Sequence, residues 1–114
     1  TGNAGIKEIE TQFKANNRKP AEHSVGYLLT YGIVDATRQI MEKTIDRVGF
    51  DALTGAAMYE TMQATGEIKA MDGVMSLQYG KDIRATNKAR IMQVQKGKFV
   101  PQTDWMVVPD LRPK

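Results

Sequence analysis

The chain has 114 residues, of which 41% are hydrophobic and 25% are charged, and its formal net charge is +3. This length allows one domain at most, and the hydrophobic share is compatible with a globular core. The sixteen Lys and Arg are mixed with thirteen Asp and Glu in no long basic block, which argues against nucleic-acid binding. The absence of cysteine excludes disulfides, thiolate metal sites and cysteine nucleophiles, and no apolar run is long enough to span a bilayer.

The first half of the chain is predicted to be helical. A short helix over residues 6–15, which Asn3 can cap, is followed by a break at Pro20. The dominant helix spans residues 25–48, with Ser24 as its N-terminal cap and Gly49 at its C-terminal end. Its apolar residues recur every three or four positions, which predicts one buried stripe. The stripe consists of Leu29, Ile33, Ala36, Ile40, Thr44 and Val48, widened by Met41 and Ile45.

A third helix is expected over residues 52–65, capped by Asp51 and ended by Gly66. Beyond it the apolar period changes. Residues 71–73 carry a turn signal, residues 74–79 are a short strand or an extended loop, and residues 80–87 read as a loop. The best strand covers residues 89–95, and it returns over residues 98–100 through a tight turn at 96–97, which predicts a hairpin. A last extended piece follows at residues 104–108.

A small group of residues near the start of the long helix is the candidate binding site. Tyr27 and Tyr31 lie four residues apart on its first turns, close to His23 in the preceding linker. Free N–H groups at a helix N-terminus favour anionic or polar ligands, so these three residues are predicted to contact a small ligand. The other interpretation is that both tyrosines pack in the core with their hydroxyls hydrogen-bonded.

Other chemistry finds little support in the sequence. His23 is the single histidine and lies in a polar linker, so neither catalysis nor a metal site is predicted. Carboxylates such as Asp35 and Glu42 fall on helix faces that read as solvent-exposed, which leaves no acid–base pair. The glycines lack the spacing of a nucleotide-binding loop, and no cofactor is expected.

Four stretches, taken in order, resemble the C-terminal part of the type I periplasmic solute-binding proteins. These are the extracellular ligand-binding receptors of ABC importers for branched-chain amino acids, amides and related solutes. The stretches are Phe13 with Asn16-Asn17-Arg18-Lys19-Pro20; Tyr27-Leu28-Leu29-Thr30-Tyr31-Gly32 leading into Asp35-Ala36; Ala57-Met58-Tyr59-Glu60-Thr61-Met62; and Arg90 to Val100 with Thr103-Asp104-Trp105. The likeness covers nearly the whole chain from about Ile6.

The resemblance implies an α/β fold in which residues 1–114 are a single partial domain, the C-terminal portion of a two-lobed protein. The intact protein would hold its solute in the cleft between two Rossmann-like lobes. Its partners would be a small-molecule solute and an ABC permease, and its location would be periplasmic or extracellular. Residues 20–24 and 71–79 are the expected hinge crossings between the lobes.

The helices carry more apolar surface than a local hairpin can cover, and exposed apolar patches drive association. We therefore expect an oligomer, in particular a homodimer with swapped or intertwined elements. A different class of function also fits the sequence, namely a self-contained α+β domain that binds another protein through its Met and Tyr faces. A small enzyme is disfavoured because nucleophiles and bases are scarce.

Overall fold

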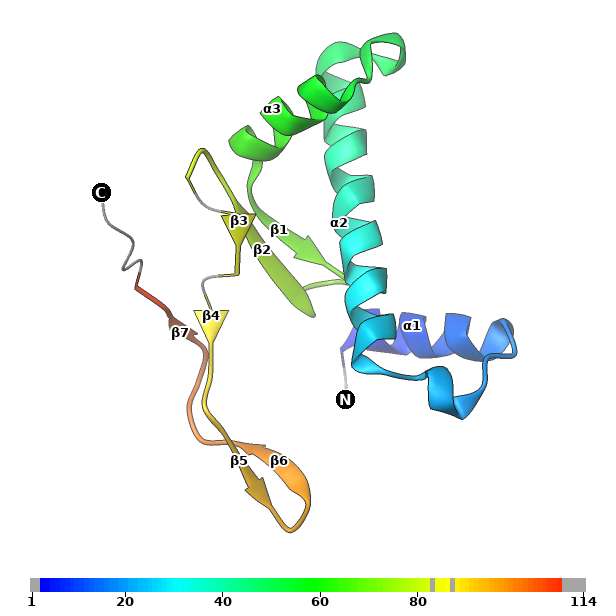
Figure 1. Cartoon of the computed structure of the whole chain (residues 1–114), viewed down its shortest axis with the longest axis vertical. Helices are drawn as coiled ribbons and strands as arrows, with labels where there is room; N and C mark the ends of the chain where they lie inside the picture. The colour runs from blue at the N-terminus through cyan, green and yellow to red at the C-terminus, as the bar shows by residue number, and fades with distance from the viewer. Residues whose placement is uncertain (1–2, 83, 87, 110–114) are drawn as a thin grey trace.

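A computed structural model describes residues 3–82, 84–86 and 88–109, and it shows a mixed helix and sheet architecture (Figure 1). The helices are α1 (Ala4–Ala15), α2 (Val25–Val48) and α3 (Gly55–Thr65), with short 3-10 turns at Pro20–Glu22 and Phe50–Ala52. The strands are β1 (Gly66–Ala70), β2 (Met75–Tyr79), β3 (Arg84–Ala85), β4 (Lys88–Ala89), β5 (Met92–Gln95), β6 (Lys98–Pro101) and β7 (Met106–Val107). This confirms the predicted order of helices followed by strands.

The predicted ends of the first two helices are confirmed. The Asn3 side chain accepts the N–H of Ile6 at 3.2 Å, and the Ser24 hydroxyl accepts the N–H of Tyr27 at 3.3 Å. Gly49 ends α2 with a φ of 83°, a conformation that costs glycine little. α1 starts at Ala4, two residues earlier than expected.

The predicted start of the third helix is wrong. Asp51 does not cap it, because residues 50–52 form a separate 3-10 turn and Leu53 is extended. The helix begins at Gly55, where the Thr54 hydroxyl accepts the N–H of Ala57 at 3.2 Å. Thr54, three positions after Asp51, is also a suitable capping residue, and it is the one that the helix uses.

The sheet contains a hairpin that the sequence only partly indicated. Gly66, at a φ of 76°, lets the chain turn from α3 directly into β1, which was not predicted. β1 pairs antiparallel with β2, Ile68 opposite Leu77, and β3 adds a short third strand from the region expected to be a loop. The C-terminal hairpin is confirmed as β5–β6, whose turn residues Lys96 and Gly97 both have positive φ. The strand expected over 89–95 is split, because β4 pairs instead with β7.

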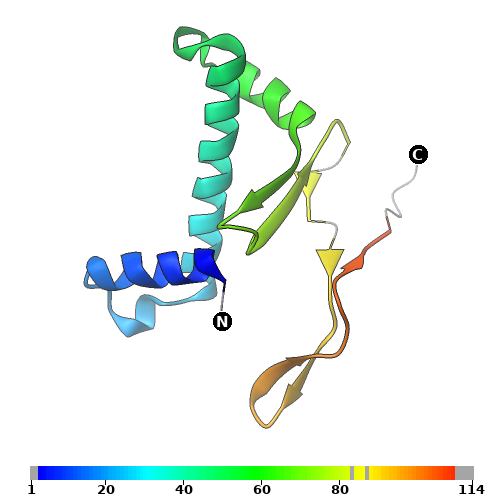
Figure 2. The same ribbon diagram turned by 180° about the vertical axis from the view of Figure 1, so that it is seen from behind.

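The core lies where α3 and the β1–β2 hairpin meet α2, and α1 buries Ile9 and Phe13 outside this cluster. The most buried apolar residues are Ile9, Phe13, Ala36, Ile40, Ile68, Ala70 and Met71. The predicted stripe is therefore confirmed at Ala36, Ile40 and Thr44, whereas Met41, which was predicted to widen it, is 39% exposed. Its N-terminal part is not confirmed, because the side chains of Leu29 and Ile33 are 48% and 58% exposed. α3 and β1 pack along the later turns of α2, whereas α1 lies beside its first turns (Figures 1 and 2).

The molecule divides into two regions of different character. The body comprises α1–α3 and β1–β3, and the arm comprises residues 88–109 with β4–β7. Within the described chain, the arm strands pair only with one another, and the arm extends away from the body (Figures 1 and 2). The radius of gyration is 17.0 Å, whereas a compact domain of this length has about 13 Å.

Candidate functional site

The structure brings the predicted site residues together with a fourth aromatic ring. The ring of Phe13, in the last turn of α1, lies edge-on to His23 at 5.0 Å and to Tyr27 at 5.3 Å between centroids. The rings of Tyr27 and Tyr31 lie 6.3 Å apart on α2. The guanidinium of Arg18 stands 5.7 Å from the centre of the Tyr27 ring. These aromatic contacts hold the linker at residues 16–24 against the first turns of α2.

Beside these rings lies a groove of about 650 Å³, which we call the aromatic groove. Its lining includes Arg18, Glu22, Tyr27, Tyr31, Asp35 and Arg38. Tyr27 and Tyr31 are half-buried, and neither hydroxyl makes a hydrogen bond to another residue of the described chain. The interpretation of both tyrosines as core residues with hydrogen-bonded hydroxyls therefore does not match the described residues. Their role in ligand binding stays a prediction.

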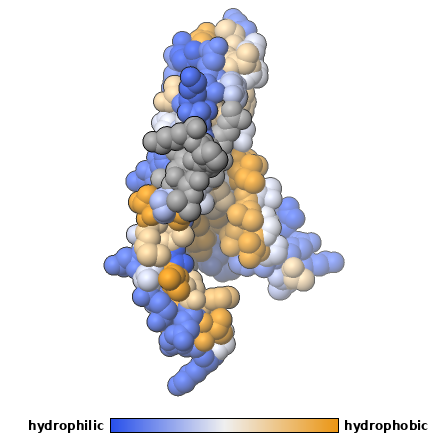
Figure 3. Space-filling view, turned by 60° about the vertical axis from the view of Figure 1, so that its left-hand side comes forward, coloured by the Kyte–Doolittle hydropathy of each residue, from blue (hydrophilic) through white to orange (hydrophobic). Residues whose placement is uncertain are grey.

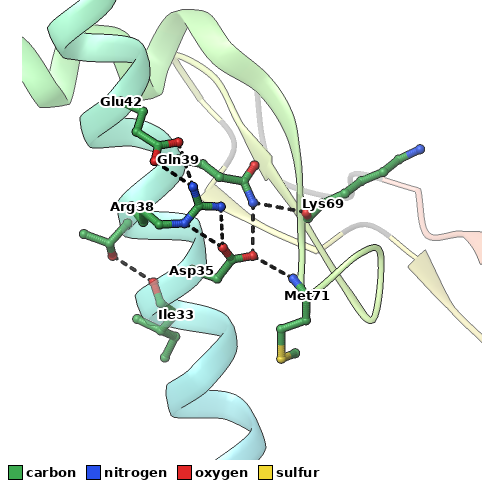
Figure 4. A network of polar contacts seen from close by, with 8 residues as sticks. Ile33, Asp35, Arg38, Gln39, Glu42, Lys69 and Met71 are labelled. Atoms are coloured by element: carbon green, nitrogen blue, oxygen red, sulfur yellow. Dashed lines mark hydrogen bonds and ion pairs between the residues drawn. The ribbon is translucent and has the colours of Figure 1, made fainter. Parts of the chain in front are cut away.

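A polar network that includes two lining residues of this groove, Asp35 and Arg38, ties α2 to the β1–β2 turn (Figure 4). The carboxylate of Asp35 accepts the backbone N–H of Met71 at 2.8 Å and a bond from Arg38 Nη2 at 2.8 Å. The amide of Gln39 donates both to Asp35 and to the carbonyl of Lys69, each at 3.2 Å. Arg38 also pairs with Glu42 at 2.7 Å. One carboxylate thus joins segments 36 residues apart in the sequence.

The environment of Asp35 keeps it ionised. Burial by itself would raise the pKa of its carboxyl, since its side chain is only 21% exposed. The hydrogen bonds from Met71, Arg38 and Gln39 outweigh burial and hold the pKa below the ordinary value of 3.8. With its lone pairs occupied, Asp35 is suited to holding the turn in place rather than to accepting a proton from a substrate.

The sequence did not reveal this network. Asp35 and Glu42 were expected to face solvent, which holds for Glu42 but is wrong for Asp35. The spacing of Asp35, Arg38 and Glu42 does signal ion pairs along one helix face. No sequence signal identifies the N–H of Met71 as a partner, because that contact exists only after the hairpin has docked on α2.

A second and larger concave surface, the apolar groove, lies on the other side of α2. It measures about 950 Å³ and runs between the first turns of α2, the β1–β2 hairpin and the β4–β7 pair. Its apolar lining includes Val25, Leu28, Leu29, Val74, Trp105 and Val107. Apolar side chains are visible on both the body and the arm in Figure 3. The sequence pattern did not predict that Trp105 and Leu29 would line the same surface.

Neither groove contains a metal-binding constellation. No group of three His, Asp or Glu side chains able to hold a metal ion occurs among the residues that the structure describes. None of the described helices combines the length and apolar character that a membrane span requires. A scan against protein-family models and searches of curated proteins and of solved structures found no match to this chain.

Proposed function

We propose that this chain is the C-terminal portion of the solute-binding protein of an ABC importer, of the type I two-lobed class. Its solute would be a branched-chain amino acid, an amide or a related small molecule. The receptor would act in the periplasm or outside the cell and would present the closed, loaded form to a membrane permease. The order of the four sequence stretches given above is the basis for this choice of family.

The observation that carries the proposal is the amount of uncovered surface. The accessible surface is 8605 Å², whereas a self-contained folded chain of this mass exposes about 6,200 Å². The uncovered part includes the first turns of α2, where Leu29, Ile33 and Val34 are all about half exposed or more. Such faces are what a portion of a larger α/β protein would present once separated from its neighbouring layers.

Within this proposal, the solute site is built from the predicted group of His23, Tyr27 and Tyr31: Tyr27 and Tyr31 line the aromatic groove, and His23, which does not line it, packs against Phe13 beside it. The aromatic groove offers rings for an apolar side chain together with the guanidinium of Arg18, which could meet a carboxylate. Arg18 is half exposed, and its ion pair with Glu22 is long, at 3.9 Å. It is therefore more available to a ligand than Arg38, which already bonds two carboxylates.

The test is calorimetry on the product of the complete gene, including whatever precedes residue 1, with branched-chain amino acids and short amides. We expect saturable binding to one site and at least about tenfold weaker binding for Tyr31→Ala. Phe50→Ala is the control, because Phe50 is 73% exposed at the opposite end of α2. An encoded protein with no second α/β lobe and no solute binding would overturn the proposal.

The second candidate is the self-contained α+β protein-interaction domain. The apolar groove favours it, because a hollowed apolar surface of this kind is common where proteins meet. An open reading frame that starts near residue 1 would support this alternative over the receptor.

A further inference from the structure

The β5–β6 hairpin of the arm has one apolar face that nothing in the described chain covers. Val94 pairs with Phe99, and Met92 pairs with Pro101, so these four side chains share one face of the two-stranded ribbon. Val94 is 63% exposed and Phe99 is 76% exposed. Gln93 and Gln95 alternate with the apolar residues along β5 and lie on the other face. This alternation is the pattern of a sheet that buries one side against a partner.

The arm and the body also differ in net charge. Residues 88–109 contain four Lys and Arg but one acid, whereas residues 3–86 contain ten Lys and Arg and eleven acids. The arm is therefore positive and the body is close to neutral. Repulsion between like charges disfavours arm-to-arm association, whereas it does not oppose contact between an arm and a body.

The apolar groove is a suitable receptor for the hairpin. Leu29 and Val74 are exposed on one wall and Trp105 and Val107 on the other. The charged lining residues balance, because Asp72 and Glu67 are matched by Lys69 and Lys88, so the groove offers an apolar rather than a charged surface. In the same molecule the hairpin lies beyond the β4–β7 pair that forms one of these walls, so it projects away from its own groove (Figures 1 and 2). A hairpin from a second molecule meets no such restriction.

The surface area agrees with reciprocal docking. The chain exposes about 2,400 Å² more than a compact monomer of its mass. Obligate homodimers bury between about 1,000 and 2,500 Å² on each partner. A two-fold dimer with two equivalent contacts can therefore cover most of this excess, because each chain contributes one hairpin and one groove.

We propose that two copies of this chain form a dimer in which each β5–β6 hairpin packs its apolar face into the apolar groove of the other copy. This inference starts from the same uncovered surface as the solute-binding proposal, but it assigns that surface, in the 114-residue chain, to a second copy. It concerns the 114-residue chain, and calorimetry on the complete gene product neither supports nor weakens it.

Light scattering coupled to size-exclusion chromatography of the 114-residue chain tests the dimer directly. We expect twice the chain mass of 12.7 kDa. Phe99→Asp, on the apolar face of the hairpin, should raise the dimer Kd at least about thirtyfold. Gln93→Asp introduces the same charge on the opposite face of the same hairpin and should leave the Kd nearly unchanged. A monomer at all accessible concentrations, or equal effects of the two variants, would overturn the proposal.

Mixing two defective variants tests whether the hairpin meets the groove. Phe99→Asp damages the hairpin and Leu29→Asp damages the groove, so each homodimer contains two damaged contacts. Their mixed dimer contains one intact contact, and we expect it to form more tightly than either homodimer. No gain on mixing would indicate hairpin-to-hairpin packing and would overturn the arrangement.

Two controls keep the test decisive. Circular dichroism shows whether each variant is folded, and Val25→Asp, at a side chain that is 71% exposed in the same groove, replaces Leu29→Asp if that variant unfolds. Binding of the chain to vesicles of phosphatidylcholine and phosphatidylserine tests whether the basic hairpin contacts a membrane instead. Binding of the wild-type chain to these vesicles as a monomer would assign the hairpin to lipid and contradict the dimer.

Discussion

The body and the arm both contain large apolar side chains, but the body buries them and the arm exposes them. In the body, Ile9 and Ile68 are each 1% exposed, and polar side chains bridge distant segments, as when Arg47 on α2 donates to Thr61 on α3 at 3.1 Å. In the arm, Phe99 and Val107 are 76% and 69% exposed, and the strands contact mainly each other. The body is thus stabilised by contacts within the chain. The apolar surface of the arm contributes to stability only when a partner buries it.

The largest expected effect follows directly from this difference. Ile68→Ala should lower the free energy of unfolding by about 4 kcal/mol, because it removes a fully buried side chain from between β1 and α2. Val94→Ala in the arm should change it by less than about 0.5 kcal/mol. Both are measured by urea unfolding at a protein concentration low enough to keep the chain monomeric. Equal losses would show that the arm packs on its own body.

A slightly smaller loss is expected where α1 docks on the β1–β2 turn. A methyl group added at Gly5 would clash with the carbonyl oxygen of Met71, which is backbone and cannot rotate away. Gly5→Ala should therefore displace α1 and cost about 3 kcal/mol of stability.

Gly55→Ala is the matched control for that substitution, since nothing lies within 4 Å of the added atom at a helical position. It should be neutral or stabilising by up to about 1 kcal/mol in the same urea experiment. A Gly5→Ala variant as stable as wild type would mean that α1 is not held against the turn.

The sequence predicted the elements that depend on neighbours in the chain. Asn3, Ser24 and Gly49 were identified because capping chemistry is local, and the Lys96-Gly97 turn marked the C-terminal hairpin for the same reason. Periodicity also found the buried part of α2 around Ile40.

Features that depend on docking were not predictable in this way. Leu29 and Ile33 were assigned to the stripe of α2 but are exposed, because the buried face runs through Gly32, Ala36, Ile40 and Thr44 and the β1–β2 hairpin packs on Gly32 instead. The site residues His23 and Tyr27 were placed together from their spacing, whereas the contact of Asp35 with Met71 depends on how the hairpin lies on α2. Strand β1 was missed because its pattern is too short to be distinguished from a loop.

The network at Asp35 gives a third and more moderate test of the body. Asp35→Ala should cost about 2 kcal/mol, because it leaves the N–H of Met71 without its acceptor and removes the bonds from Arg38 and Gln39. Asp46→Ala, at an exposed position on the same helix, should be close to neutral. The free energies of unfolding in urea measure both, and equal costs would show that Asp35 contributes only a surface charge.

The smallest effect concerns pH, and its sign follows from the lowered pKa values of Asp35 and Glu67. For Asp35, hydrogen bonds outweigh burial, and for Glu67 the hydroxyl of Ser76 and then the ammonium of Lys88 favour the ionised form. A carboxyl whose pKa is lower in the folded state stabilises the protein above its unfolded pKa, near 4, and this stability is lost as the pH falls through the folded pKa. The free energy of unfolding should therefore decline from about pH 5 downward.

The same titration separates the two carboxyls. Asp35→Ala should make the decline shallower, because the larger network is gone, whereas Glu67→Gln should change it less, because its ion pair with Lys88 is at the surface and is screened. Unfolding curves at several pH values between 7 and 3 at constant ionic strength supply the slopes. A steeper decline in the Asp35→Ala variant would reverse the assigned sign and show that burial, not hydrogen bonding, governs this carboxyl.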